Sequence, residues 1–146
     1  MTALHPYSVL ITHHDPGEQE ILRQVVESEG CQPVLASSGE EALDVVQEKP
    51  VHLALLDMHL PTLTGLETLK LIRQTGSVIP CILLTSETGE VIMRMAFRAK
   101  AFSVIPKPVR IRIVRGTVVK ALIRVYGKHE ETGQNQETTP TNQYSR

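Results

Sequence analysis

The stretch VHLALLDMHLP at residues 51–61, followed by a glycine at position 65, decides the fold of this chain. Its first six residues are nearly all apolar, and the run ends in a carboxylate, Asp57. An ionisable side chain is an unusual end for a strand of this buried kind. In an open parallel sheet, however, ligands bind at the carboxyl ends of the strands. Asp57 is therefore a candidate functional residue at the end of a buried strand.

Three other apolar runs also end in polar residues. The run Val9–Thr12 leads into the sequence HHD at residues 13–15. The run Ile82–Thr85 ends in a hydroxyl, and Val104–Ile105 lies two residues before Lys107. A carboxylate, a hydroxyl and an ammonium at successive strand ends suggest a phosphoryl site, in which one group is the nucleophile and two donate to the phosphoryl oxygens.

Short apolar runs alternate five times with stretches of helical periodicity. We expect strands near residues 7–12, 31–36, 51–57, 80–85 and 102–105. We expect the five helices to begin at a cap at residue 15, after residues 38–39, after residue 65, near residue 90 (to 99) and near residue 110 (to 126). This alternation predicts a parallel sheet covered on both faces. The predicted fold class is α/β, a doubly wound five-stranded parallel sheet of flavodoxin-like order.

The predicted helices carry caps and apolar stripes. Asp15 can cap the first helix, Pro16 suits its first position, and Glu18 has the spacing of a capping box. Helical spacing predicts that one face of each helix packs inward. The predicted inward residues are Ile21, Leu22, Val25 and Val26; Ala42, Leu43, Val45 and Val46; Leu66, Leu69, Leu71 and Ile72; and Val114, Val118, Ala121, Leu122 and Val125.

Length and composition are those of an ordinary globular domain. The 146 residues are 41% apolar and 21% charged, and the net charge of −1 favours neither nucleic acid nor membrane as a bulk partner. We expect one domain over residues 1–127 and a disordered polar tail over residues 128–146. No segment has the pattern of a signal peptide or a membrane span. Cys31 and Cys81 are expected to be buried thiols in a reducing compartment, so the expected location is cytoplasmic.

Across about residues 7–127, the chain resembles a receiver domain of two-component response regulators, of the stand-alone type found in chemotaxis regulators. The segment LLDMHLP at residues 55–61, with Gly65, resembles the family's phosphoacceptor segment. Thr85 matches the family's switch hydroxyl, and Lys107-Pro108 matches its lysine–proline pair, where the family usually has a cis peptide bond. The order and spacing of these elements together are specific.

The resemblance implies a phosphorelay protein. Asp57 would accept a phosphoryl group from a histidine kinase or phosphotransfer protein, Lys107 would pair with the acyl phosphate, and Thr85 would turn to hydrogen-bond it. The chain would then be a signalling module and not an enzyme. We expect no fused output domain, so that the signal passes to an unknown downstream protein by direct contact.

The end of the first strand departs from the family, which normally places two acids there to hold Mg²⁺ together with the phosphoacceptor. His13 and His14 occupy these positions, and imidazole is a poor ligand for a hard cation that prefers oxygen. We therefore expect Mg²⁺ to bind weakly, if at all. The candidate metal ligands are Asp57, His14 and His59, with Asp15 as an alternative to its role as a helix cap.

Three interpretations of the two histidines remain open. In the first, the acidic pocket has decayed, and the histidines are partly exposed polar residues. In the second, His14 and Asp57, with His59 nearby, bind a softer divalent ion such as Mn²⁺ or Zn²⁺. In the third, a protonated histidine itself supplies the missing positive charge, because imidazole titrates near neutral pH.

The output surface also differs from the family pattern. Val104 stands where the family commonly has an aromatic ring that reports the state of the switch hydroxyl, and valine is too short and too stiff at χ1 for that movement. In the family, the surface of the fourth helix, fifth strand and fifth helix often contacts partners. The last helix carries a basic outer face there, made of Arg110, Arg112, Arg115, Lys120 and Arg124. Direct nucleic-acid binding is not expected, because no DNA-binding domain is present in this sequence.

Three functions are compatible with the sequence. The leading one is phosphorylation-dependent signalling through Asp57. The second is a pseudo-receiver, an interaction module of the same fold that works without phosphoryl transfer. The third is a phosphohydrolase with an aspartyl nucleophile, but such enzymes usually have a second carboxylate two residues later, where this chain has His59.

Overall fold

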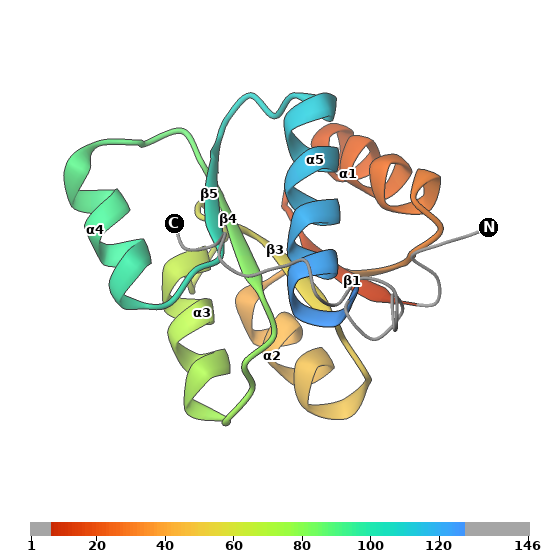
Figure 1. Ribbon diagram of the computed structural model, residues 1–146. Coiled ribbons are helices and arrows are strands. Elements are labelled where there is room, and N and C mark those ends of the chain that lie inside the picture. Colours follow the sequence, from red (N-terminus) through yellow and green to blue (C-terminus); the bar gives the residue numbers. More distant parts are fainter. Residues whose placement is uncertain (1–6, 128–146) are drawn as a thin grey trace, which may run out of the picture.

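A computed structural model describes residues 7–127, in which five parallel strands form one sheet of order β2-β1-β3-β4-β5 (Figure 1). The strands are β1 (Ser8–Thr12), β2 (Gln32–Ala36), β3 (Leu53–Asp57), β4 (Cys81–Thr85) and β5 (Ser103–Pro106). The helices are α1 (Pro16–Ser28), α2 (Gly39–Glu48), α3 (Gly65–Gln74), α4 (Glu90–Arg98) and α5 (Ile111–Leu122), which continues into a π-helical turn, η1 (Ile123–Gly127). The predicted fold class is confirmed, and each strand begins one or two residues later than the sequence suggested.

The sheet divides the core into two layers. Figure 1 shows α1 and α5 side by side over one face of the sheet, and α2, α3 and α4 over the other. Strand β3 is fully buried and feeds both layers: Leu53 and Leu55 pack toward α1 and α5, while Ala54 and Leu56 pack toward α2 and α3. A strand covered on both faces must be apolar at successive positions, which explains the unbroken run that precedes Asp57.

Two helix starts show how local hydrogen bonds position the loops around the sheet's carboxyl edge. Asp15 caps α1, as predicted, by accepting a hydrogen bond from the Gly17 N–H at 2.9 Å. The predicted capping box with Glu18 is wrong, because the Asp15 N–H donates to His13 Nδ1 and Glu18 turns to His13 instead. A full capping box does form at α3, between Thr64 and Glu67.

Several predicted inward positions are more exposed than the helical pattern indicated. Ile21 is 37% exposed, and Leu71 is only partly buried, as are Leu43, Val45 and Val46 of the short helix α2. These side chains lie at the edges of the apolar stripes of their helices, where one side of the side chain packs inward and the other contacts solvent. The remaining predicted core positions of α1, α2, α3 and α5 up to Leu122 are buried.

Val125, predicted to face inward, is 42% exposed. The cause is the π-helical turn at residues 123–127, because its wider hydrogen-bond spacing shifts the following side chains around the helix axis. Tyr126 faces the domain instead, and its hydroxyl donates to the His52 carbonyl at 2.8 Å. The fifth α-helix therefore ends four residues earlier than the predicted end at residue 126.

The remaining global predictions concern cysteines, membranes and the tail. Cys31 and Cys81 are both buried and free, as expected. Among residues 7–127, the helices are too short and too polar to cross a bilayer. The predicted tail at 128–146 lies outside the described residues.

Candidate functional site

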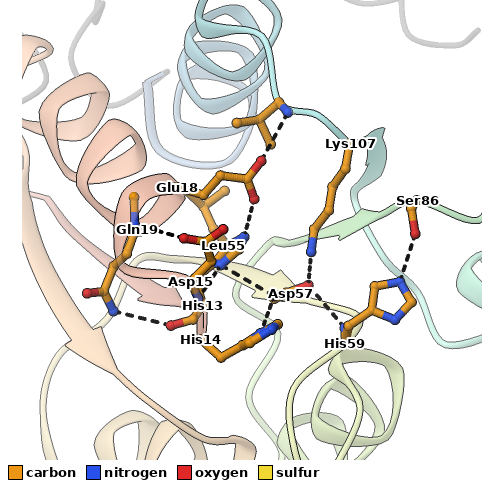
Figure 2. A network of polar contacts seen from close by, with 12 residues as sticks. His13, His14, Asp15, Glu18, Gln19, Leu55, Asp57, His59, Ser86 and Lys107 are labelled. Atoms are coloured by element: carbon orange, nitrogen blue, oxygen red, sulfur yellow. Dashed lines mark hydrogen bonds and ion pairs between the residues drawn. The ribbon is translucent and has the colours of Figure 1, made fainter.

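Asp57 ends β3 and is completely buried (Figure 2). Its Oδ1 atom accepts two hydrogen bonds, from Lys107 Nζ at 2.6 Å and from the His59 N–H at 3.0 Å. Its backbone N–H donates to Thr12 Oγ1 at 3.1 Å, and the Thr12 hydroxyl donates to the Leu55 carbonyl at 3.2 Å. The carboxylate is therefore held by Lys107, which follows β5, and by the loop after β3, while Thr12 of β1 holds the backbone of Asp57.

Gly65 allows the loop after β3 to fold back on the phosphoacceptor segment. A Cβ at this position would lie 2.6 Å from the Asp57 carbonyl oxygen and 2.8 Å from its carbonyl carbon, both of which are backbone atoms. The Gly65 N–H also points toward the Met58 carbonyl, at 3.3 Å. This close approach explains why the sequence motif needs glycine eight residues after the carboxylate.

Lys107 reaches Asp57 from the end of β5. Its backbone N–H donates to the Thr85 carbonyl at 2.9 Å, and the Lys107–Pro108 peptide bond is cis, as the resemblance implied. Burial opposes ionisation of Asp57, but the hydrogen bonds from Lys107 and His59 outweigh it and keep the pKa of Asp57 below its ordinary value. Asp57 is therefore a carboxylate at neutral pH, which is the form that can act as a nucleophile.

His13 is buried, with only 2% of its surface exposed, whereas the His14 side chain is about half exposed. The Asp15 N–H donates to His13 Nδ1 at 3.1 Å, which places the ring proton of a neutral imidazole on Nε2. Burial is the main cause that lowers the pKa of His13, although the Asp57 and Glu18 carboxylates oppose it. The geometry therefore favours a neutral His13 over the protonated one considered above.

Glu18 is a site residue that the sequence analysis assigned to a different task. Its Oε1 atom lies 2.6 Å from His13 Nε2, but too far from the direction of the N–H bond for a hydrogen bond in this arrangement. Its Oε2 atom lies 3.5 Å from the Val109 backbone nitrogen in the loop that carries Lys107. The sequence held one signal for this contact, a histidine at a strand end followed by an acid in the first turn of the next helix. The same spacing also fits a capping box.

Thr85 is buried at the end of β4, one residue beyond the register partner of Asp57. Its hydroxyl donates to the Glu87 carbonyl at 3.1 Å and accepts from the Glu87 N–H at 2.9 Å. The imidazole of His59 points toward Ser86 Oγ at 3.1 Å and thus away from Asp57 (Figure 2). The Thr85 hydroxyl lies at the expected strand end, but both of its hydrogen bonds are made to Glu87 in the following turn.

His13, His14 and Asp57 form a group of potential metal ligands. One ligand atom from each residue lies within 4.8 Å of the others. Asp57 Oδ2 lies 3.5 Å from His13 Nδ1 and 3.3 Å from His14 Nδ1. Within residues 7–127, the group includes the His13 ring and not that of His59. The Asp15 carboxylate is turned to its cap position at Gly17.

This donor set does not fit Mg²⁺. Mg²⁺ requires near-octahedral oxygen ligation, mostly from carboxylates, phosphates and water. Here Asp57 Oδ1 is taken by Lys107 and His59, which leaves Oδ2 as the single carboxylate oxygen of the group. The two remaining donors are imidazoles, and Lys107 neutralises the carboxylate charge that a hard cation would need.

Comparisons with known proteins agree with this geometry. The model of the family described as "Response regulator receiver domain" matches residues 9–118. The transcriptional regulatory protein CpxR of Escherichia coli K12 is 30% identical over 133 residues, which are 91% of this chain and 56% of CpxR. The response regulator RR06 of Streptococcus pneumoniae is 30% identical over 132 residues, which are 90% of this chain and 60% of RR06. The chain thus spans little more than half the length of these curated relatives.

Solved structures share the fold. A CheY-like receiver domain protein from Methanospirillum hungatei superposes with a TM-score of 0.77 at 24% identity, covering 86% of this chain and 98% of that one. The chemotaxis protein CheY4 of Vibrio cholerae gives a TM-score of 0.71 at 24% identity, covering 82% and 98%. The family match, the five-stranded sheet and the strand-end carboxylate and lysine agree, and the chain belongs to the response regulator receiver domains, a family of phosphorylation-accepting signal-transduction modules.

Proposed function

We propose that Asp57 accepts a phosphoryl group from the phosphohistidine of a histidine kinase or phosphotransfer protein. The observation that carries this proposal is the unequal environment of the two carboxylate oxygens. Oδ1 is held by Lys107 and the His59 N–H, whereas Oδ2 is buried and has no hydrogen-bond donor. Oδ2 therefore keeps its lone pairs for nucleophilic attack, and the half-exposed His14 ring would have to move aside for a phosphodonor to reach it.

The transfer follows from this arrangement. Oδ2 attacks the phosphorus, the P–N bond of the phosphohistidine breaks, and its electron pair remains on the donor's imidazole, which takes up a proton. The charge on the phosphoryl oxygens must be neutralised during the transfer. Lys107, with its ammonium 2.6 Å from Oδ1, is placed to do this by moving a short distance toward the phosphoryl group.

Thr85 gives the site a second arrangement. Its hydroxyl now bonds to Glu87, and rotation toward a phosphoryl oxygen on Asp57 would release the turn that begins at Ser86. That turn leads directly into α4, whose side chains Val91 and Met93 are 60% and 45% exposed. We infer that phosphorylation signals to a protein partner by changing this turn and the surface of α4. Because Val104 replaces the aromatic ring that commonly reports the switch in the family, the signal does not depend on a ring rotation at that position.

The experiment is incubation with phosphoramidate or acetyl phosphate, with and without Mg²⁺, followed by intact mass measurement. We expect one added phosphoryl group in the wild type and none in Asp57→Asn. Asp44→Asn, which alters an exposed carboxylate on α2, is the matched control and is expected to behave as the wild type.

A pseudo-receiver is the second candidate, and the two imidazoles at the usual acidic positions favour it. Because imidazoles occupy these positions, the site does not suit the Mg²⁺ that helps to position the phosphodonor in the family. Absence of an adduct under every metal condition would support this candidate. The phosphohydrolase is less well supported, because the His59 ring is turned toward Ser86.

A further inference from the structure

We propose that His13, His14 and Asp57 bind a transition-metal ion of the Zn²⁺ class, with His13 Nδ1, His14 Nδ1 and Asp57 Oδ2 as its three protein ligands. This site would replace the Mg²⁺ site typical of the family with one of different metal preference. The proposal concerns the unphosphorylated protein and does not depend on phosphoryl transfer to Asp57.

The distances suit a tetrahedral ion. Zn²⁺ binds imidazole nitrogen and carboxylate oxygen at about 2.0–2.2 Å, so two of its ligand atoms lie roughly 3.3–3.5 Å apart. Asp57 Oδ2 lies 3.5 Å from His13 Nδ1 and 3.3 Å from His14 Nδ1. The ligand atoms of the three residues all lie within 4.8 Å of one another, and the two rings are 5.8 Å apart at an angle of 16°. The exposed His14 ring would have to rotate so that both Nδ1 lone pairs point to one ion.

The buried polar atoms need a ligand. Asp57 Oδ2 is inaccessible to solvent and has no hydrogen-bond donor, although a buried acceptor of this kind is costly to leave unpaired. No proton lies between it and His13 Nδ1, because that nitrogen accepts the Asp15 N–H. The single lone pair of His13 Nδ1 is taken by the Asp15 N–H, so the 3.5 Å approach to Asp57 Oδ2 contains no hydrogen bond. A metal ion would accept electron pairs from both atoms once His13 Nδ1 releases the Asp15 N–H.

Glu18 completes the arrangement. Histidines that bind metals usually donate their other ring N–H to a carboxylate, which orients the ring and raises its basicity. Glu18 Oε1 lies 2.6 Å from His13 Nε2, on the side of the ring opposite the proposed metal (Figure 2). The contact is not aligned as a hydrogen bond in this structure, and metal binding at Nδ1 would have to turn the ring so that the Nε2–H points to Glu18.

The charges at the site select the kind of metal. Lys107 neutralises Asp57, so the group offers little net negative charge to attract a hard ion such as Mg²⁺. Neutral imidazoles bind Zn²⁺, Co²⁺, Ni²⁺ or Cu²⁺ through their lone pairs and do not need that charge. The half-exposed side chain of His14 lies at the entrance, so an ion can reach the site, and the fourth coordination position stays open for water.

The test is a titration of the full chain, first stripped with a chelator, with Zn²⁺ in competition with a chromogenic chelator, and with Co²⁺ followed by its visible absorption. We expect one ion per chain, and a visible spectrum typical of tetrahedral Co²⁺. His14→Ala removes an exposed ligand and does not threaten folding. Both His14→Ala and Asp57→Asn should weaken Zn²⁺ binding at least tenfold, and Glu18→Gln by about 10- to 100-fold.

His59→Ala is the matched control, because it removes an exposed imidazole that points to Ser86 and keeps the backbone N–H that donates to Asp57 Oδ1. It should leave the affinity unchanged. His5 and His129 remain in every variant, so any ion that they bind cancels in the comparison. The proposal is overturned if the stripped wild type binds no Zn²⁺ or if equimolar Mg²⁺ displaces the bound ion. It is also overturned if His14→Ala and Asp57→Asn bind Zn²⁺ as tightly as the wild type, or if His59→Ala weakens binding as much as His14→Ala. Phosphorylation is measured separately, so failure of one proposal leaves the other intact.

Discussion

Removing the ammonium of Lys107 should expose how much the fold depends on this single ion pair. Asp57 is fully buried, and its Oδ1 lies 2.6 Å from Lys107 Nζ. With an effective dielectric constant of about 20, two unit charges at this distance attract by about 6 kcal/mol. Part of that attraction offsets the desolvation of the carboxylate. Loss of one partner of a buried pair typically costs about 3–5 kcal/mol, because the other charge is left uncompensated.

The variant Lys107→Met keeps the length of the side chain and removes the charge. Because the His59 N–H still donates to Oδ1, we expect the lower end of that range, a loss of about 3 kcal/mol in the free energy of unfolding. In an Asp57→Asn background, the same change leaves no buried charge and should cost less than about 1 kcal/mol. Urea denaturation of the wild type, both single variants and the double variant gives the coupling between the two side chains.

The pH dependence provides a second check. In the wild type the pKa of Asp57 is held below its ordinary value, so its stabilising contribution is present above that ordinary value and is lost as pH falls through the folded-state pKa. In Lys107→Met, burial remains while the largest opposing contact is gone, so the pKa of Asp57 rises. The deficit of the variant should therefore shrink as pH falls from this raised pKa to the lower folded-state pKa of the wild type. An equal cost of Lys107→Met in both backgrounds, or a deficit that does not change with pH, would refute the reasoning.

Three further outcomes follow from the geometry. Gly65→Ala should destabilise the domain by about 1–3 kcal/mol in urea denaturation, because its Cβ would lie 2.6 Å from a backbone carbonyl oxygen. Gly116→Ala in α5 has open space around its Cβ and should stabilise the domain by up to about 1 kcal/mol in the same assay. Burial raises the pKa of the Cys31 and Cys81 thiols to about 11, so iodoacetamide at neutral pH should label them at least about 100-fold more slowly in the folded than in the unfolded protein, and equal rates would contradict their burial. Burial lowers the pKa of His52, so its neutral form stabilises the fold at high pH, and this contribution is lost as pH falls below about 6.5. In His52→Asn, which can still accept the Ser8 N–H, the stability difference between about pH 7.5 and about pH 5.5 should be smaller than in the wild type. An unchanged difference would rule out this assignment.

The sequence by itself determined the sheet and the side chains that end its strands. Five apolar runs separated by helical stretches admit few parallel arrangements, and the unbroken apolar run of β3 requires cover on both faces. Because the carboxyl ends of parallel strands share one edge, Asp57, Thr85 and Lys107 had to lie near one another, whatever the details of the loops.

Only the tertiary structure decided which partner each polar group takes at that edge. Glu18 has the spacing of a capping box, but the buried His13 ring occupies the Asp15 N–H and draws the Glu18 carboxylate to its other nitrogen. His13 was not among the predicted ligands, but its ring lies in the group around Asp57. The predicted ligand His59 instead turns its ring toward Ser86. The π-helical turn that exposes Val125 is likewise invisible in a pattern with a period of 3.6 residues. Local spacing is common to several hydrogen-bond arrangements of similar energy, and burial, which depends on distant residues, selects among them.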